Sequence, residues 1–489
     1  MKLLKFTLIC LSGLILTSCF EDNDDNAVTA SEINDFVWKA MNAGYLYKDE
    51  IPDLANNRFS SNEEYAAYLN SLNTPEAIFE SLIFEREVTD RFSAIIPDYI
   101  AFEQAQQGTT LNNGLEFIFF FEPGSNTEVY GVIRLVLNNS VADNLGLQRG
   151  QIFDAIDGVQ LTENNLGQLL NQTTYTLNFA NYNDNGTDTL NDDFIESTTQ
   201  QISLTAEVYT ENPVHLTEII PVNGENVGYL VYNGFNRNFN VELNNAFGEF
   251  AANNVQHLVL DLRYNPGGSV DTARLLGSMV TGQFNGEVYS KLVYNSDLSS
   301  ENVNFEFVNN FDGNTINSLN LNKIYVLTTR RSASASELVI NSLDAYIDVI
   351  QIGENTVGKT QASVTLYDSP TLAPEDINPN HTYALQPLVA NSINVNDVAV
   401  PGVGLTPDIF RTEVGRDFGT LGDVNELLLS AALTDIGGTG RSSFFNPEPA
   451  VTQVAINFSV KPFEEGMYID NQEIPNLSKI ELSAPSGNN

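Results

Sequence analysis

The sequence has few of the side chains that most often carry catalytic or redox chemistry. Its 489 residues include 2 cysteines, 3 histidines and 1 tryptophan, and 22 lysines and arginines stand against 63 aspartates and glutamates, a formal net charge of −41. A field of that sign repels phosphate backbones, so nucleic acid is not an expected partner. His215, His257 and His381 stand in no catalytic or metal-binding motif, so neither a metal site nor another cofactor is expected.

Both cysteines lie near the N-terminus. A short basic start precedes an apolar run, Phe6 to Leu16, which is typical of a signal peptide and too short to span a bilayer comfortably. Cys10 lies in that run, and Cys19 follows Leu-Thr-Ser, which is similar to a bacterial lipobox. We expect residues 1–18 to be removed, Cys19 to be lipidated and 19–29 to be an acidic tether at the bacterial cell envelope, on its periplasmic face or at the surface. An ordinary signal peptide with an incidental cysteine is the alternative.

The rest of the sequence predicts a mixed α/β, multidomain protein. Apolar residues at helical spacing predict an N-terminal helical domain over 30–105, and β-rich runs predict a second domain over 106–208. Alternating strand and helix patterns over 209–440 are typical of a largely parallel sheet. The tail, 441–489, has two strand-like runs and suggests no function. The residues behind the helical prediction are Ile33, Phe36, Val37, Ala40 and Met41, with Trp38 expected to be packed beside them and Ser60–Glu64 to cap the next helix.

The second domain resembles a PDZ domain. The resemblance rests on Gly114-Leu115-Glu116-Phe117, similar to a carboxylate-binding loop, on Ser140-Val141-Ala142 at the start of a short helix, and on Ile156-Asp157-Gly158. Gln151 departs from the aspartate that such domains usually carry. PDZ domains bind a peptide C-terminus by adding a strand to a sheet edge, with backbone N–H groups holding the carboxylate. The resemblance implies that role for residues 114–117; a spacer that binds nothing is the alternative.

One loop of this domain has a distant likeness to a calcium site. Asn181 to Asp192 has Asn at its first position and Asp at its twelfth, where a calcium loop has Asp and Glu. A hairpin turn through Asn185-Gly186 accounts for the same residues without a metal.

Three serines alternate with alanines in the stretch RRSASASELVI, residues 330–340. The stretch follows a predicted strand, Lys323 to Thr329, and leads into a predicted helix that begins at Ser334. Ser334 and Glu337 fit a capping box, S-x-x-E, which is the purely structural interpretation. In the functional interpretation, a serine at a helix N-terminus faces the positive end of the helix dipole, which stabilises an oxyanion formed beside it.

Two further motifs flank this stretch. In Asp261 to Gly268, DLRYNPGG, the strand His257–Arg263 runs into a Pro-Gly-Gly turn, and consecutive glycines allow backbone N–H groups to point at a substrate oxygen. Gly353 to Thr360 meets the phosphate-loop pattern G-x-x-x-x-G-K-T. A phosphate loop opens a helix, however, and residues 362–367 have a strand pattern, which argues against phosphate binding.

Together these motifs resemble the C-terminal processing (tail-specific) serine proteases. The resemblance covers residues 30–440, in the order helical segment, PDZ domain and a βα protease core of the ClpP/crotonase-like type. In that family the nucleophile is the middle serine of S-A-S-A-S-E, here Ser334, and the catalytic lysine falls at Lys359, 25 positions later. Gly402 to Asp408 is similar to the family's late G-x-G-hydrophobic-x-P-D turn.

The resemblance implies a serine endopeptidase without a cofactor that cuts exported proteins or peptides, bound through their C-terminal tails. A lysine is protonated at neutral pH unless burial disfavours its charged form, as a general base requires. Lys359 would then deprotonate Ser334, which forms an acyl-enzyme with the substrate. The oxyanion would be held by the N–H of Ala335 with that of Gly267 or Gly268.

The chain departs from the family at one expected position. The glutamine that lies four residues after the lysine in well-known members is replaced by Ser363. Gln361 shares a strand face with Lys359 and Ser363, so either side chain is a candidate to orient the amine. The missing glutamine leaves open a peptide-binding lipoprotein with weak or no activity, and a phosphate-binding protein built on residues 353–360 is the third alternative.

Overall fold

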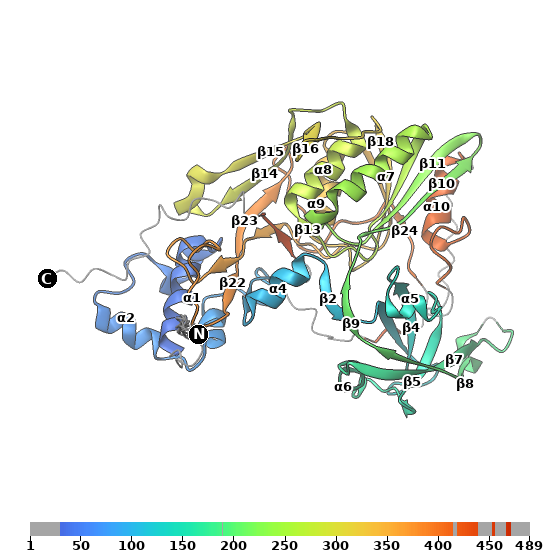
Figure 1. The fold of residues 1–489 in the computed structure, drawn as a ribbon, viewed down its shortest axis with the longest axis horizontal. Coiled ribbons are helices and arrows are strands. Elements are labelled where there is room, and N and C mark those ends of the chain that lie inside the picture. The colour runs from blue at the N-terminus through green and yellow to red at the C-terminus, as the bar shows by residue number, and fades with distance from the viewer. Residues whose placement is uncertain (1–29, 188, 414–417, 439–451, 455–465, 471–489) are drawn as a thin grey trace, which may run out of the picture.

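The structure, a computed structural model, describes residues 30–187, 189–413, 418–438, 452–454 and 466–470. The predicted signal peptide, Cys19 and its tether lie outside these ranges. Within them, no helix combines the length and apolar character needed to cross a membrane. Figure 1 shows helices of the N-terminal part at one end, a strand-rich unit below and a larger αβ core above.

The N-terminal part is helical, as predicted. Its first helix buries the expected apolar face, and Trp38 is packed against Phe59 and Tyr65 while its indole N–H donates to the Asp53 carbonyl oxygen at 2.8 Å. Ser61 caps the second helix by accepting from the Glu64 N–H. The helices are α1 Ala30–Gly44, α2 Asn62–Leu69, α3 Pro75–Ser81 and α4 Tyr99–Gln106, with short 3₁₀ helices Lys48–Glu50 and Pro52–Leu54.

The strand-rich unit is an antiparallel sheet in the order β3-β4-β5-β7-β8 around its own apolar core. Ser140 caps the short helix α5, as its sequence predicts, and the turn at Asn185-Gly186 has positive φ at both residues. The elements are β3 Leu115–Phe121, β4 Val129–Val136, α5 Val141–Asn144, β5 Ile152–Ile156, β6 Val159–Gln160, α6 Leu166–Leu170, β7 Thr174–Asn183, the 3₁₀ helix Leu190–Asp192 and β8 Phe194–Thr205. A two-stranded ribbon, β2 Thr109–Asn112 with β9 Glu207–Thr210, joins the unit to its neighbours.

The core is built on a six-stranded sheet in the order β10-β11-β12-β18-β19-β24, parallel except for β10. Its inner strands are apolar on both sides because helices α7, α8 and α9 cover one face and α10 covers the other (Figure 1). The bounds are β10 Val214–Val222, β11 Glu225–Tyr232, the 3₁₀ helix Arg237–Phe239, α7 Asn240–Ala252, β12 Val255–Asp261, α8 Val270–Thr281, β18 Lys323–Thr328, α9 Ala335–Asp344, β19 Asp348–Gly353, β24 Ile409–Phe410 and α10 Leu427–Ile436.

A second six-stranded sheet has the order β13-β25-β20-β23-β14-β15, and a three-stranded sheet β1-β22-β21 joins the N-terminal part to the core. The bounds are β1 Ala94–Ile96, β13 Gly268–Ser269, β14 Val288–Tyr294, the 3₁₀ helix Ser296–Glu301, β15 Val303–Glu306, β16 Asn310–Phe311, β17 Asn314–Thr315, β20 Gln361–Ser363, β21 Leu366–Tyr367, β22 Ala384–Gln386, β23 Leu388–Ile393 and β25 Met467–Tyr468.

The mixed α/β class is confirmed, and two strand predictions are corrected. The strand predicted to reach Arg263 ends at Asp261, and the Arg263 guanidinium turns back to pair with the Asp261 carboxylate. The strand predicted over 362–367 is two short strands in different sheets, β20 and β21. Most of the two strand-like runs predicted in the tail lies outside the described residues.

A buried cluster of charges fastens the strand-rich unit to the core. Arg263, 1% exposed, donates to Glu426 at 2.7 Å and to Glu413 at 3.0 Å. Arg149 of the strand-rich unit reaches the same Glu413 oxygen at 2.5 Å. Removing one partner of such a cluster leaves a buried charge uncompensated, which is strongly destabilising.

Glu413→Gln tests how much this cluster stabilises the fold. Burial raises the pKa of Glu413, but Arg149 and Arg263 outweigh it and hold the pKa at about 2, below the ordinary 4.5. A carboxyl group whose pKa is lowered in the native state stabilises that state at pH values above its ordinary pKa of 4.5. This stabilisation, about 3 kcal/mol, is lost as the pH falls from 4.5 towards 2. We expect the variant to unfold at lower urea concentration at neutral pH and to lose less stability on acidification. Glu207→Gln, at an exposed carboxylate, is the control; the same acid dependence in all three proteins would contradict the prediction.

Candidate active site

Ser334 is held in a strained backbone conformation at the start of α9. The chain leaves β18, turns, and enters the helix with Ser334 at φ 62° and ψ −110°, which a residue with a Cβ rarely adopts. Its side chain is fully buried. Strain of this kind persists only where the surroundings enforce it, and it gathers at functional sites.

The three serines of the motif have different surroundings. The Ser332 hydroxyl donates to the Leu262 carbonyl oxygen at 2.8 Å, and the Ser336 hydroxyl donates to the Asn265 carbonyl oxygen at 3.0 Å. Among the described residues, the Ser334 hydroxyl has no hydrogen-bond partner. Ser332 and Ser336 therefore hold the serine loop against the loop that follows β12, while the Ser334 hydroxyl is uncommitted.

The capping box expected from Ser334 and Glu337 is present at the start of α9, with two unequal contacts. The Ser334 N–H donates to Glu337 Oε2 at 2.7 Å, whereas the Ser334 hydroxyl approaches the Glu337 N–H without making a hydrogen bond. The positive φ of Ser334 accompanies this difference from an ordinary cap, whose backbone is extended. The structural interpretation of the motif therefore accounts for the glutamate but not for the serine hydroxyl.

Glu337 also holds the loop that carries the lysine. Its Oε2 accepts from the Lys359 N–H at 2.9 Å, and its Oε1 accepts from the Gly358 N–H at 2.7 Å and from the Thr356 hydroxyl at 2.5 Å. Burial raises the pKa of Glu337 against the opposing effect of these bonds. One carboxylate oxygen thus accepts hydrogen bonds from the backbone N–H groups of both Ser334 and Lys359. The sequence pattern predicted only the helix-capping contact with Ser334.

The N-terminal part of the chain covers the lysine. The Lys359 side chain is 1% exposed, and its Nζ lies 5.0 Å from the centroid of the Phe92 ring. Arg91 donates to the carbonyl oxygens of Gly358 at 3.3 Å and Gly402 at 3.2 Å, so it joins the lysine loop to the late G-x-G turn. Sequence reasoning missed Arg91 and Phe92, which stand in no motif.

The two candidates for orienting the lysine donate their hydrogen bonds elsewhere. The Ser363 hydroxyl donates to the Met467 carbonyl oxygen at 3.0 Å, and the Gln361 amide donates to the Tyr47 hydroxyl at 3.0 Å. The pairing of β20 with β23 is also irregular between Ala362 and Ser363, which weakens the argument from strict alternation of faces. The orienting role stays a prediction for both residues.

The Pro-Gly-Gly turn packs directly against Ser334. Gly267 and Gly268 have φ of 117° and 132°, and a Cβ on Gly267 would lie 2.8 Å from that of Ser334. The Gly267 N–H already donates to Asn265 Oδ1 at 2.9 Å. The Ala335 N–H is the first of α9 and so has no acceptor within the helix. Of the predicted oxyanion donors, Gly267 therefore has its N–H already engaged by Asn265.

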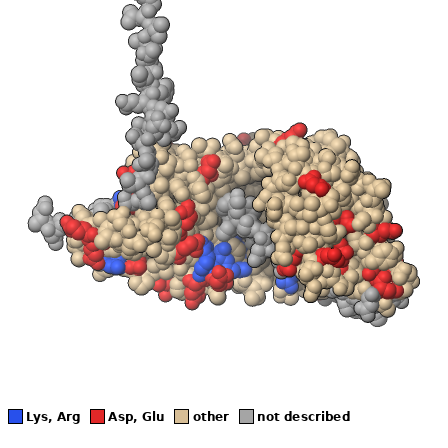
Figure 2. All heavy atoms as spheres, turned by 90° about the horizontal axis from the view of Figure 1, so that it is seen from below, with Lys and Arg blue, Asp and Glu red and all other residues tan. Residues whose placement is uncertain are grey.

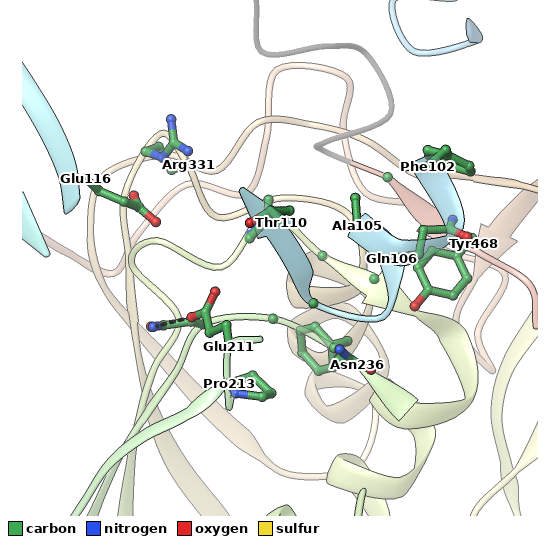
Figure 3. A pocket seen from close by; sticks show the side chains of 18 residues that line it. Phe102, Ala105, Gln106, Thr110, Glu116, Glu211, Pro213, Asn236, Arg331 and Tyr468 are labelled. Carbon is green, nitrogen blue, oxygen red and sulfur yellow. Dashed lines mark hydrogen bonds between the residues drawn. The ribbon is translucent and has the colours of Figure 1, made fainter. Parts of the chain in front are cut away.

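A cavity of about 400 Å³ opens beside this turn (Figure 3). Glu211 lies in it, where burial, with a contribution from the charge of Glu116, raises the Glu211 pKa to about 7 although a hydrogen bond from Asn233 opposes this. Glu116 and Arg331 lie together at one side of the view, and Tyr468 at the other. Further lining residues are Phe102, Gln106, Phe235, Gly267 and Gly268.

A second cavity, of about 520 Å³, lies along β3 in the strand-rich unit. Leu115, Glu116 and Phe117 line it opposite Leu170, the last residue of α6. The N–H groups of Gly114 and Leu115, expected to hold a peptide carboxylate, donate to the side chains of Asn112 at 2.7 Å and Asn113 at 3.2 Å. Glu116 and Arg331 border both cavities, so the two hollows adjoin.

The remaining candidates lie apart from this arrangement. His257 pairs with Glu225 at 2.8 Å and His381 with Asp368 at 2.9 Å, and no group of potential metal ligands gathers among the described residues. Residues 353–360 lead into strand β20, which confirms the expected difference from a phosphate loop. On the face in Figure 2, acidic side chains are spread over the molecule and basic ones are few, in keeping with the charge of −41.

A strained, buried serine beside a glycine turn, tied through a shared carboxylate to a loop with a buried lysine, is an arrangement suited to serine-type hydrolysis. Comparison with known proteins agrees. The pattern of peptidase family S41 matches residues 226–409, and that of the peptidase S41 N-terminal domain matches residues 32–94. The chain belongs to peptidase family S41.

Individual proteins are similar to this chain over part or most of its length. The chain is 29% identical over 237 residues to a chloroplastic C-terminal processing peptidase of Tetradesmus obliquus, covering 45% of each chain, and 25% identical over 294 residues to carboxyl-terminal-processing peptidase 3 of Arabidopsis thaliana, covering 57% of this chain and 50% of that one. The match spans about half the length of these relatives. A crystal structure of a Bacteroides fragilis protein assigned to the S41 proteases aligns with a TM-score of 0.67 at 26% identity, over 83% of this chain and 97% of that one.

Glu337→Gln tests the shared carboxylate. The new amide would place a donor among the N–H groups of Ser334, Gly358 and Lys359, so buried donors would lose their acceptor. We expect a loss of about 2–4 kcal/mol in the free energy of unfolding, measured by urea denaturation. Glu242→Gln is the matched control, because Glu242 is exposed at the third position of α7, as Glu337 is buried at the third position of α9. Equal stability of the two variants would contradict this assignment.

Proposed function

We propose that this protein is a serine endopeptidase in which Ser334 is the nucleophile and Lys359 the general base. The observation that carries the proposal is the Ser334 hydroxyl, which alone among the three serines of the motif is left without a hydrogen bond, in a strained turn against Gly267. A nucleophile needs a hydroxyl that is not committed to the fold. The shared contact with Glu337 brings the lysine loop to the serine.

The reaction follows from this placement. Lys359 takes the proton of the Ser334 hydroxyl, and the Ser334 oxygen attacks the carbonyl carbon of a peptide bond. Burial disfavours the charged form of an amine, which is what a lysine base requires. The N–H groups of Ala335 and Gly268 hold the oxyanion, the leaving amine takes the proton from Lys359, and water then hydrolyses the acyl-enzyme.

The strand-rich unit is proposed to bind substrates as a PDZ domain does. In support, β3 is an edge strand with a cavity between it and α6, at the end where Gly114 and Leu115 lie. A peptide carboxylate would replace Asn112 and Asn113 as the acceptor for the N–H groups of that turn. The adjoining cavity at Gly267 and Gly268 gives a bound tail a route to the serine.

The cellular setting is proposed from the N-terminal sequence alone. Residues 1–18 would be removed and Cys19 lipidated, which would hold the enzyme at the bacterial cell envelope and give it exported proteins as substrates. The acidic tether after Cys19 would separate the folded part from the membrane.

A second candidate is a peptide-binding protein of the same fold. It is favoured by the burial of both Ser334 and Lys359, which are 0% and 1% exposed. Binding of peptide tails without any cleavage would support this candidate over the protease.

Ser334→Ala and Lys359→Ala test the dyad. We expect each to reduce cleavage of an unstructured protein with an apolar C-terminus by at least about 10³-fold, because the nucleophile or its base is lost. The measurement is kcat/KM on the purified protein without its signal peptide. Ser332→Ala and Ser336→Ala are matched controls, expected to cost about 1 kcal/mol of stability each and to keep cutting. The assignment fails if cleavage survives both dyad substitutions.

Amidation of the substrate C-terminus tests the role of the strand-rich unit. A peptide amide cannot offer the negative charge that the turn at Gly114 would bind, so we expect a higher KM with kcat little changed. The comparison uses the same peptide with a free carboxylate. Equal KM values would show that the tail is not held through its carboxylate.

A further inference from the structure

The C-terminal tail contacts the strand-rich unit at its ligand-binding edge. The Phe121 N–H donates to the Thr452 carbonyl oxygen at 3.0 Å, and the Val454 N–H donates to the Phe119 carbonyl oxygen at 3.0 Å. The pairing is antiparallel, at Phe120 and Gln453, on β3, whose other edge is taken by β4. Val454 is 2% exposed and packs in the apolar core of the unit. This is the geometry of a peptide that adds a strand to a sheet edge.

The same tail also fills the sheet beside the active site. Strand β25, Met467–Tyr468, lies between β13 and β20 and is parallel to both. β13 contains Gly268, a proposed oxyanion donor, and β20 begins two residues after Lys359. The Ile469 N–H donates to the Ser363 carbonyl oxygen at 3.0 Å, and the Ser269 hydroxyl donates to Asp470 at 2.6 Å.

The tail engages groups that catalysis is proposed to need. The Ser363 hydroxyl, a candidate to orient Lys359, donates to the Met467 carbonyl oxygen. Gly466 and Tyr468 form part of the wall of the cavity beside Gly267 and Gly268, with Tyr468 facing it in Figure 3. Both places that an extended substrate would occupy, at β3 and at β13, are therefore in contact with one segment of the chain itself.

We propose that residues 452–454 and 466–470 act as an intramolecular ligand, so that an extended peptide substrate binds by displacing them from β3 and from the sheet beside Ser334. The expected effect of the tail on cleavage rests on the proposed function. The displacement of the tail by a bound peptide rests on the strand pairing alone. A tethered segment competes at a high effective concentration, so peptides in solution bind weakly until the segment is released.

Chain direction explains how such a ligand escapes cleavage. On β3 the tail runs antiparallel, as a PDZ ligand does, so its later residues follow towards the end of β3 where Gly114 lies. A substrate held there by its C-terminus presents its earlier residues to Ser334. The tail instead places its later residues, 466–470, beside Ser334, so its chain runs through the site in the direction opposite to that of a substrate. The tail blocks the site in an orientation unlike that of a substrate.

The first test measures binding without cleavage, in full-length protein carrying Ser334→Ala. The probe is a fluorescein-labelled peptide of residues 449–457, followed by anisotropy. Val454→Asp places a charge in an apolar core and releases the tail from β3, so we expect it to raise the affinity for the probe at least about tenfold. Gln453→Asp adds the same charge at the neighbouring exposed side chain and should change the affinity less than about twofold. Val454→Ala, a milder change, gives the same direction if Val454→Asp does not fold.

The second test uses the active protein. Val454→Asp and Asp470→Ala should raise kcat/KM for an unstructured substrate, and the wild-type tail should stay intact by mass spectrometry. Unchanged probe affinity in the Val454 variants, slower cleavage in folded variants, or cutting of the tail between residues 454 and 466 would each overturn the inference. Tighter probe binding with no cleavage by any variant would support the intramolecular ligand and reject the proposed protease activity.

Discussion

The site depends on one buried carboxylate. Glu337 receives the N–H groups of Ser334, Gly358 and Lys359 and the hydroxyl of Thr356, so the loops after β18 and β19 meet on a single side chain. Its desolvation is compensated by these four donors, and breaking the set would leave a charge in the interior. Because Glu337 holds the serine through its backbone, the serine hydroxyl is left for chemistry. A helix cap and the proposed nucleophile therefore share one motif without competing.

Other parts of the chain support this arrangement from three directions. Asn265 accepts from Ser336 and holds the Gly267 N–H, which fixes the glycine turn against the serine loop. Arg91 joins the lysine loop to the turn at Gly402, so the N-terminal helices are part of the site's support. Beneath the turn, the charge cluster around Arg263 connects the core to the strand-rich unit. Strain at Ser334 is tolerated because these supports converge on it.

The sequence predicted what short-range patterns encode. The start of α9 follows from the capping-box pattern, and Ser334 and Lys359 were singled out through a family resemblance. Arg91 and Phe92 were missed because their contacts reach the lysine loop from a distant part of the chain and have no local signature. Strand β25 is two residues long, too short for a period to appear. The irregular pairing after Ala362 likewise depends on the partner strand, which no local pattern reports.

Burial of the proposed dyad is compatible with catalysis if release of the chain's own tail opens the sheet beside it. A buried lysine is favoured as a neutral base, yet a buried serine cannot meet a substrate. Both requirements are met when the element that closes the site is β25, a strand held by only a few hydrogen bonds. An incoming peptide can replace it because the peptide also offers backbone N–H and carbonyl groups to β13 and β20. The exchange replaces one strand by another of the opposite direction, so β13 and β20 keep a backbone partner. In the closed site the tail occupies the place between β13 and β20, and in the proposed active protease a substrate peptide occupies it.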